Sequence, residues 1–190
     1  MKKGLEKFYD LVDAFEMLPT IGKKSAQRLA HYIVTENSYA GMKLSHSIQT
    51  AISTIRQCKQ CYAMSENELC DICTDTVRDE QILCIVQNSK DIFLIEDSKQ
   101  FKGKYFVLES LEEHILENLN YLVASQNIKN ILFAVTPSIA NDAFILYIED
   151  RLKNFDIEFT KIAQGVPTGV SLENVDLLSL SKAINGQIKV

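Results

Sequence analysis

Four cysteines limit most strongly what this chain can fold into. They form two Cys-x2-Cys pairs with eight residues between the pairs: Cys58, Cys61, Cys70 and Cys73. Each pair presents two thiolates from a tight turn, so two pairs can close a tetrahedral site around one zinc ion. Disulfides and unrelated buried thiols are the alternatives. Because all four ligands are thiolates, no position remains for water, and we expect the zinc to be structural.

The composition indicates a folded chain without a membrane span. Hydrophobic residues make up 46% of the 190 positions, and no apolar run approaches the ~20 residues that a bilayer requires. The first residues, MKKGLEKFYDLVDAF, are interrupted by acidic side chains and favour an amphipathic helix over a signal peptide. We therefore expect a cytoplasmic, reducing location, where paired cysteines bind metal rather than forming disulfides.

Charge is distributed unevenly along the chain. Residues 1–57 carry eight Lys and Arg against five Asp and Glu, a net charge of +3, whereas residues 58–190 carry twelve against twenty, a net charge of −8. A contact with nucleic acid is therefore better sought in the N-terminal part.

The segment before the cysteines has the periodicity of helices. We expect helices at about 5–16, 23–35 and 45–56, broken by Pro19 and Gly22 and by a loop over 37–41. The residues expected to face inward are Leu5, Phe8, Val12, Phe15, Ala26, Leu29, Ala30, Ile33, Ile48, Ala51, Ile52 and Ile55.

After the cysteines, apolar runs alternate with helical patterns. This order favours an α/β domain with a largely parallel sheet, followed by a short C-terminal helix that ends at Gly186. The expected strands are 82–86, 105–108, 131–135 and 157–162, and the expected helices are 89–97, 111–126, 139–154 and 177–185.

Residues 18–28, LPTIGKKSAQR, have the character of a phosphate-binding hairpin. The turn at Gly22 frees backbone N–H groups at the start of the next helix, and these donors attract an anion together with the helix dipole. Lys23 and Lys24 add charge beside them, and Arg28 lies one turn further on. The alternative is an ordinary helix connection with a solvated basic end. A P-loop is excluded, because Met17 stands where glycine is required and Lys24 where a hydroxyl is required.

Taken together, these motifs resemble the RecR family of bacterial recombination mediators. The resemblance rests on the pattern L-P-x-I-G-x-K-S-A-x-R-L-A, the four cysteines, and three later segments, in this order along nearly the whole chain. The later segments are 103–108 (GKYFVL), 162–169 (IAQGVPTG) and 178–184 (LSLSKAI).

The resemblance implies a four-part organisation. It comprises a helix-hairpin-helix DNA-binding region over 1–56, a zinc finger over 57–76, a Toprim domain over 77–170 and a C-terminal oligomerisation segment over 171–190. It also implies a homodimer or homotetramer that holds DNA in a ring. Such an assembly would act with RecO, and often RecF, to load the RecA recombinase at single-stranded gaps.

The chain departs from relatives of this fold at the positions that carry chemistry. Catalytic Toprim domains hold magnesium with a Glu after the first strand and an Asp-x-Asp after a later one. Here Gln87 and the segment 136–138 (TPS) stand at those positions, so the ligands for two-metal catalysis are missing. The acids Asp91, Glu96 and Asp142 lie nearby in sequence without the spacing of a site. Members of the family also often have Gly at Thr20, Arg or His at Gln164, and a Gly-rich loop where 109–113 reads ESLEE.

The remaining reactive residue types are better explained by structure. Cys84 lies inside an apolar run and is expected to be a core residue. His31, His46 and His114 have no partner at catalytic or metal spacing, so we expect surface or partly buried histidines. The segment G-x-P-x-G at 165–169 is most simply a tight turn after a strand, with a subunit or nucleotide contact as the alternative.

These observations leave three hypotheses for function. The first is a non-catalytic DNA clamp and recombination mediator in which Gly22, Lys23, Lys24 and Arg28 contact phosphates. The second is a magnesium-dependent Toprim nuclease or primase-like enzyme, which the missing acids oppose. The third is a protein-interaction module of the repair complex that binds DNA poorly on its own.

Overall fold

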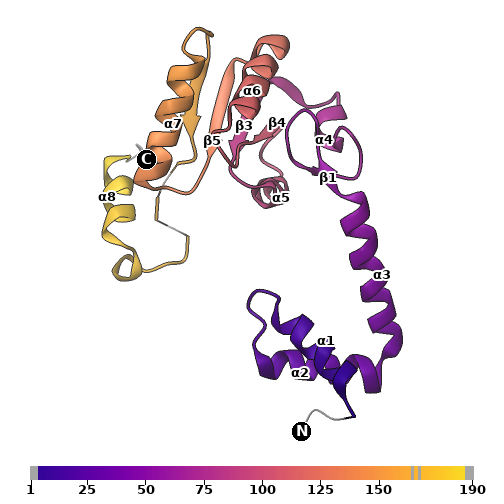
Figure 1. The fold of residues 1–190 in the computed structure, drawn as a ribbon. Helices are drawn as coiled ribbons and strands as arrows, with labels where there is room; N and C mark the ends of the chain where they lie inside the picture. Colours follow the sequence, from indigo (N-terminus) through magenta and orange to yellow (C-terminus); the bar gives the residue numbers. More distant parts are fainter. Residues whose placement is uncertain (1–3, 164, 167, 187–190) are drawn as a thin grey trace. The chain divides into compact units, whose positions relative to one another are not determined.

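The computed structural model describes residues 4–163, 165–166 and 168–186. The chain divides into two compact units, Met1–Ile55 and Arg56–Val190 (Figure 1). Each unit has its own hydrophobic core, and each is described separately below.

The N-terminal unit is helical, and a small core joins its first two helices. Val12, Ala26 and Ala30 are buried at its centre, and Phe8 and Phe15 pack around them. The expected helices at 5–16 and 23–35 are thereby confirmed in their main part, although Leu5 and Leu29 are exposed rather than inward. The helical segments of this unit are α1 (Glu6–Glu16), α2 (Lys23–His31), the π-helical segment η1 (Tyr32–Glu36) and α3 (Ser38–Thr54).

The expected loop over 37–41 is wrong, because α3 begins at Ser38 rather than near residue 45. The Asn37 side chain caps the helix by accepting a hydrogen bond from the Ala40 N–H at 2.9 Å, which is the usual role of asparagine at this position. Gly41, the last residue of the expected loop, has a packing role: a Cβ there would collide with the Ile33 side chain in η1. The glycine therefore allows two helical segments to approach closely.

The inward face expected for the third helix is also wrong. Ile48, Ile52 and Ile55 keep 49%, 78% and 46% of their surface exposed, and Ala51 is exposed as well. Leu44 lies on the same face of the helix, one turn before Ile48, and its side chain is also exposed. The periodicity marks an apolar stripe along α3 and its C-cap residue (Leu44, Ile48, Ile52 and Ile55), and in the single chain this stripe remains exposed.

The second unit contains a four-stranded sheet in which all neighbouring strands are parallel. The order is β4-β3-β5-β6, so β4 and β6 form the edges. The prediction of a largely parallel α/β sheet is confirmed. The strands are β3 (Asp79–Val86), β4 (Gly103–Val107), β5 (Asn130–Ala134) and β6 (Glu158–Lys161), and the helices are α5 (Ser89–Ser98), α6 (Glu113–Gln126), α7 (Ile139–Leu152), the 3-10 turn η2 (Leu172–Asn174) and α8 (Leu177–Asn185).

Both faces of the sheet are buried, and the side chains alternate between them as strand geometry requires. Leu83 and Ile85 of β3 pack with α6 and α7. Cys84 and Val86, between and after them, pack with α5 and with the cysteine segment. This double burial explains why the strands are continuous apolar runs in the sequence.

The cysteine segment forms a compact knuckle against the β4 edge of the sheet. It contains the short antiparallel pair β1 (Arg56–Gln57) and β2 (Met64–Ser65), followed by the single helical turn α4 (Asp71–Thr74). Figure 1 shows this knuckle beside β4, and the chain that leaves the knuckle leads into β3.

The C-terminal helix expected from the sequence is confirmed. Helix α8 covers 177–185, and the Gly186 N–H closes it by donating to the Lys182 carbonyl at 2.9 Å. The turn expected at 165–169 includes residue 167, and Gln164 precedes it; both positions lie outside the described residues. No helix in the described ranges has the length and apolar character needed to cross a membrane.

Candidate metal centre and nucleic-acid interface

The four cysteine sulfurs meet at one point. The ligand atoms of Cys58, Cys61, Cys70 and Cys73 all lie within 4.8 Å of one another, and three of the residues are buried. The Sγ atoms of Cys58 and Cys73 are 3.8 Å apart, and those of Cys61 and Cys70 are 3.5 Å apart. A tetrahedron with Zn–S bonds of about 2.3 Å has sulfur–sulfur distances of about 3.8 Å, so the cluster fits zinc.

The same distances exclude disulfides. A disulfide requires sulfurs about 2.05 Å apart, and all five cysteines are free. Without metal, the thiols hydrogen-bond to one another: these bonds, first of all the one with Cys61, lower the pKa of Cys58, and the pKa of Cys61 is raised in turn by its bond with Cys58. The Cys70 N–H also donates to the Cys58 sulfur at 3.3 Å.

The backbone of the knuckle is bonded directly to the sheet. The Val107 N–H at the end of β4 donates to the Cys61 carbonyl at 2.8 Å. Within the knuckle, the Cys58 N–H donates to the Ala63 carbonyl, also at 2.8 Å. The first cysteine pair is therefore fixed both to its own hairpin and to the edge strand of the larger domain.

Tyr62 secures the same junction from the other face of the sheet. Its backbone has a φ of 61°, in the left-handed region that non-glycine residues rarely adopt. Its ring meets Phe106 of β4 edge to face with centroids 5.5 Å apart, and its hydroxyl accepts a hydrogen bond from Asn118 of α6 at 2.7 Å. The knuckle therefore contacts both faces of the sheet around the β4 edge.

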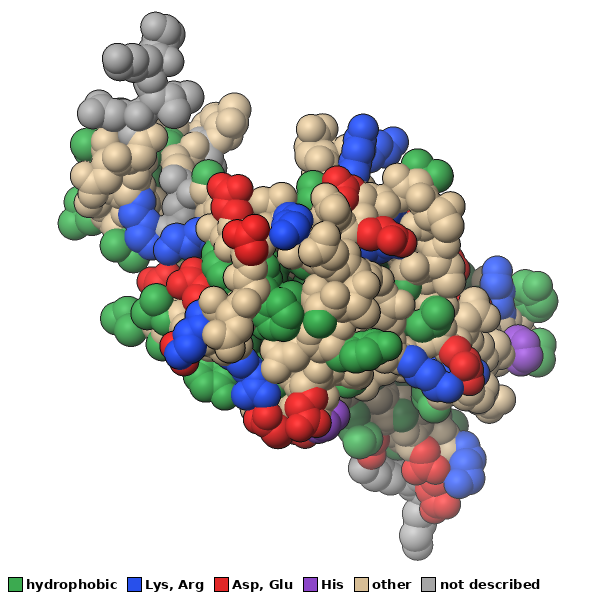
Figure 2. Space-filling model, turned by 90° about the horizontal axis from the view of Figure 1, so that it is seen from above, with side chains coloured by type: hydrophobic (Ala, Val, Ile, Leu, Met, Phe, Trp, Pro, Cys, Tyr) green, Lys and Arg blue, Asp and Glu red, His purple; other side chains and the backbone are tan. Residues whose placement is uncertain are grey.

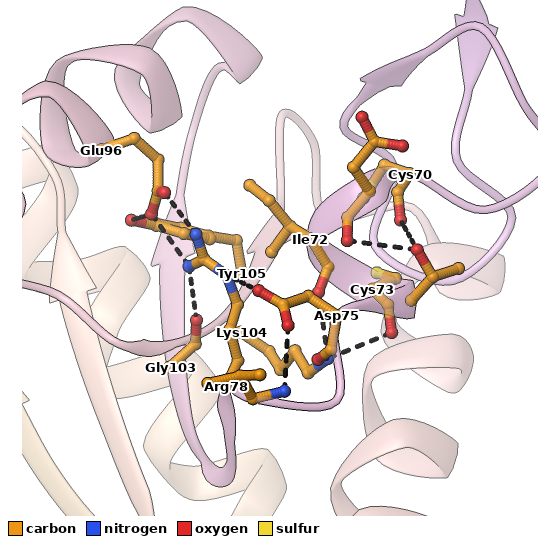
Figure 3. Close-up of polar contacts among 12 residues, drawn as sticks. Cys70, Ile72, Cys73, Asp75, Arg78, Glu96, Gly103, Lys104 and Tyr105 are labelled. Carbon is orange, nitrogen blue, oxygen red and sulfur yellow. Dashed lines mark hydrogen bonds and ion pairs between the residues drawn. The ribbon is translucent and has the colours of Figure 1, made fainter.

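Lys104 is a buried lysine in β4, and the sequence motifs above do not predict a role for it at the cysteine knuckle. Only 1% of its surface is exposed. Its Nζ donates to the carbonyls of Ile72 at 3.0 Å, Cys73 at 3.1 Å and Asp75 at 2.6 Å (Figure 3). The signal in the sequence is a lysine within an apolar strand. A lysine buried there needs hydrogen-bond or charged partners.

A second polar network lies next to Lys104. Arg78 donates to the carboxylate of Glu96 through both terminal nitrogens and to the Gly103 carbonyl at 3.0 Å, and Figure 3 shows Tyr105 converging on the same carboxylate. The Tyr105 hydroxyl donates to Glu96 at 2.6 Å. The hydrogen bonds from Arg78 lower the pKa of Glu96 despite its partial burial, so Glu96 is a structural ion-pair partner.

The hairpin predicted to bind phosphate has the expected helix start. Gly22 is the N-cap of α2, and the first backbone bond within the helix runs from the Ala26 N–H to the Gly22 carbonyl at 3.0 Å. The three N–H groups before Ala26 have no partner within the helix. Lys23, Lys24 and Arg28 are all exposed, and in the described part of the chain none of the three has an ion-pair partner.

The left-handed residue of this hairpin is Thr20 rather than Gly22. Thr20 has a φ of 69°, whereas Gly22 has φ −85° and ψ 166°, a conformation open to any residue. A Cβ at Gly22 would meet nothing within 4 Å. No contact among the described residues therefore requires glycine at residue 22, and the backbone there is open to approach from outside.

After the carboxyl end of β3, Gln87, at the first position where catalytic Toprim domains have an acid, pairs with an amide in the first turn of α7. Gln87 and Asn141 exchange two hydrogen bonds, and Asn141 also donates to the Thr136 carbonyl at 2.7 Å. Asp142 pairs with Lys161 at 3.2 Å. Among the described residues, the four cysteines are the only group of three or more potential ligands brought together.

The remaining sequence predictions about reactive groups are confirmed. Cys84 is fully buried, and burial raises its pKa to about 12, so it is a neutral core thiol. His31, His46 and His114 are exposed. His31 lies 3.4 Å from Glu36, and His114 lies 3.5 Å from Glu112.

Comparison with known proteins gives two family matches that follow one another along the chain. The model of the RecR helix-hairpin-helix matches residues 8–52, and the model of the RecR four-cysteine zinc finger domain matches residues 55–75. These ranges contain the basic hairpin and the four cysteines, respectively. The second match agrees with the geometry of the sulfurs, and the chain holds a structural zinc ion.

Full-length relatives show the same relationship. The chain is 54% identical to "Recombination protein RecR" of a Nitratiruptor species over 190 residues, covering all of both chains. It is 53% identical to that of a strain of Campylobacter jejuni subsp. jejuni, again over all of both chains. With that of a strain of Helicobacter pylori it shares 46% identity over 99% of this chain and 97% of the relative. The chain therefore belongs to the RecR family of recombination proteins.

Proposed function

We propose that this protein is a non-catalytic DNA clamp and mediator of recombinational repair. The observation that carries the proposal is the start of α2, where backbone N–H groups without a partner in the helix lie beside the exposed cations Lys23, Lys24 and Arg28. A helix start with free donors and adjacent cations binds phosphate without reading bases. Family membership supports a role in recombination.

The surroundings of the hairpin fit a nucleic-acid strand. Gly22 has open space where a side chain would stand, so a phosphate can approach the backbone closely. Lys24 and Arg28 also line a surface cavity of about 950 Å³ together with Phe8 and Tyr32. Basic and aromatic side chains in one groove provide contacts to both the backbone and the bases of a strand.

The absence of catalysis is part of the proposal. The amides of Gln87 and Asn141 satisfy each other where a Toprim enzyme needs carboxylates. Amides carry no charge to hold two magnesium ions against a phosphate. We infer that the Toprim domain serves as a scaffold and a contact surface.

A clamp requires several copies of the chain. The stripe of Leu44, Ile48, Ile52 and Ile55 on α3 is exposed in the single chain, and large apolar patches of this kind mark protein interfaces. We propose that the stripe contacts a second copy in a dimer or tetramer. Gathering several hairpins multiplies weak phosphate contacts. In the cytoplasm this assembly would act with RecO, and with RecF where present, to load RecA at gaps.

Binding of labelled gapped DNA, measured by fluorescence anisotropy over a salt series, tests the proposal. We expect log affinity to fall linearly with log salt, with a slope of about −0.9 per duplex phosphate neutralised and about −0.7 per single-strand phosphate. Lys24→Ala should lower both the affinity and the slope. Lys43→Ala removes the same charge from an exposed position on α3 and should have little effect. Binding that is insensitive to salt, or equal effects of the two variants, would contradict the site assignment.

A protein-interaction module is the second candidate, and the charge distribution favours it. The chain beyond residue 57 has a net charge of −8, and on the face in Figure 2 acidic and basic side chains are interspersed without a large basic field. An oligomer that stays silent toward DNA at low salt, and that binds DNA only when purified RecO is added, would favour this candidate.

A further inference from the structure

We propose that Lys104 is a positioning residue for the zinc ion. Its buried ammonium group holds the turn that carries the second cysteine pair, and its positive charge offsets the negative charge of the zinc–thiolate centre. This proposal concerns metal binding and is independent of how the chain contacts DNA.

The geometry places Lys104 between the sheet and the knuckle. It lies in β4, where it is in register with Leu83 of the central strand, and its Nζ reaches the end of α4 (Figure 3). The three carbonyls that it binds belong to Ile72, Cys73 and Asp75. The last carbonyls of a helix have no partner in the helix, so the three N–H bonds of one ammonium group bind the carbonyls at the end of this turn, including that of the ligand Cys73.

The charge of Lys104 has no local anionic partner in the described part of the chain. Its hydrogen bonds go only to neutral carbonyls, and the acids nearby are bound to another cation, since Arg78 pairs with Glu96 and Asp75. Burying an ammonium ion is costly unless an opposite charge is near. Four thiolates around Zn²⁺ carry a net charge of −2, and this centre is the anion that the arrangement lacks.

The two effects act on the same ligand. The Cys73 carbonyl that binds Lys104 belongs to the residue whose sulfur lies 3.8 Å from that of Cys58. Fixing the backbone of α4 fixes the direction of the second Cys-x2-Cys pair. Partners outside the ligand sphere that orient and tune ligands in this way change metal affinity by about 10–100-fold when removed.

The test is the zinc affinity of the full-length protein, measured by competition with a chromophoric chelator, for three substitutions at this position. Lys104→Met, which removes both the charge and the donors, is expected to weaken zinc binding by about 10–100-fold. Lys104→Gln keeps amide donors without charge and is expected to lose affinity as well. Lys104→Arg keeps the charge, and this variant is expected to bind zinc more tightly than Lys104→Met or Lys104→Gln. The absorption spectrum of the Co²⁺-substituted protein reports whether the four-sulfur geometry is retained.

Asn118→Ala is the matched control, because it breaks the contact between Tyr62 and α6 without changing charge near the metal. Its zinc affinity should stay close to that of the parent. Parental affinity in Lys104→Met would overturn the proposal, and parental affinity in Lys104→Gln would overturn the role of charge. If Asn118→Ala lost as much zinc affinity as Lys104→Met, any weakening of the knuckle would lower zinc affinity, and the specific role of Lys104 would be contradicted.

Discussion

Gln87 and Asn141 bind each other through reciprocal amide hydrogen bonds, with Gln87 Nε2 2.8 Å from Asn141 Oδ1 and Asn141 Nδ2 3.2 Å from Gln87 Oε1. The pair joins the end of the central strand β3 to the first turn of α7. Ligands of parallel α/β sheets bind at this carboxyl edge, and here a neutral contact within the protein lies at that edge.

Gln87→Glu is expected to destabilise the fold without creating a magnesium site. A carboxylate cannot donate to Asn141 Oδ1, so a partly buried acceptor loses its partner, which costs about 1–3 kcal/mol. The segment 136–138 still provides no second acid, so magnesium should not restore stability. Urea unfolding at neutral pH, with and without millimolar magnesium, measures both effects. Stabilisation of the variant by magnesium would contradict this account of the edge.

Removal of zinc should unfold the knuckle and weaken the sheet domain, because Cys58, Cys61 and Cys70 are part of the core that covers one face of the sheet. Structural zinc contributes about 10–16 kcal/mol of apparent binding free energy in small peptides. Circular dichroism melts before and after chelation should show a large fall in Tm. Thiol titration should show four reactive cysteines before the buried Cys84. An unchanged melt after verified zinc loss would contradict this role.

Thr20→Gly should stabilise the N-terminal unit. A β-branched residue at a φ of 69° carries a conformational cost of about 1–2 kcal/mol that glycine avoids. The more flexible unfolded chain of the glycine variant offsets part of this gain, so we expect a net increase of about 1 kcal/mol in the free energy of unfolding. Thr20→Ala, which keeps the Cβ, is the control and should not show the gain. A less stable glycine variant would show that the Thr20 side chain has a favourable role.

Acid should weaken the junction between β4 and α5 through Glu96. Its pKa is lowered from the ordinary 4.5, chiefly by the hydrogen bonds from Arg78. A carboxyl group with a depressed folded-state pKa contributes stability that is fully present above its unfolded pKa and is lost as the pH falls through its folded pKa. We expect Glu96→Gln to lower stability at pH 7 by about 1–3 kcal/mol and to flatten the pH dependence below about pH 5.

Glu113→Gln is the matched control for this pH series. Glu113 pairs with Arg151, but 64% of its side chain is exposed, and exposed ion pairs contribute only about 0–1 kcal/mol. Identical acid profiles of the parent and Glu96→Gln, from denaturant unfolding at several pH values, would contradict the prediction.

Ile52→Glu should dissociate the proposed dimer or tetramer without unfolding the chain. The side chain is 78% exposed in the single chain, so a charge there has little effect on the stability of the monomer but cannot be buried in an interface. Light scattering should show a lower mass, and the affinity for gapped DNA should fall with it. Val77→Glu, the control, places the same charge at a residue that is 92% exposed in the second unit. A mass unchanged by Ile52→Glu would place the contact elsewhere.

The parts of the fold that repeat a local rule could be predicted from the sequence. Strands of a buried parallel sheet are continuous apolar runs in the sequence. The observed bounds of β3, β4, β5 and β6 therefore lie within a few residues of the predicted ones. The four cysteines were found by spacing alone. The start of α3 differs from the expected loop over 37–41, and Asn37, a typical N-cap residue, is the signal in the sequence that marks it.

The polar contacts that join elements could not be predicted in the same way. Three of these contacts join residues 29 or more positions apart in the sequence: Lys104 with Asp75, Asn118 with Tyr62, and Asn141 with Gln87. No local pattern encodes such a partner, because it depends on how strands and helices pack. The exposure of Ile52 was missed for the same reason: periodicity identifies an apolar face, but not the surface that will cover it.

The hydrogen bond from Val107 to Cys61 has a consequence for the life of the protein in a cell short of zinc. It lies at the β4 edge of the sheet, and an uncovered edge strand with an apolar face is a template for intermolecular pairing. A chain that loses its metal loses the cover of this edge as well as a ligand. Metal shortage would therefore expose this edge to pairing with other chains, and we expect aggregated protein as one of its consequences.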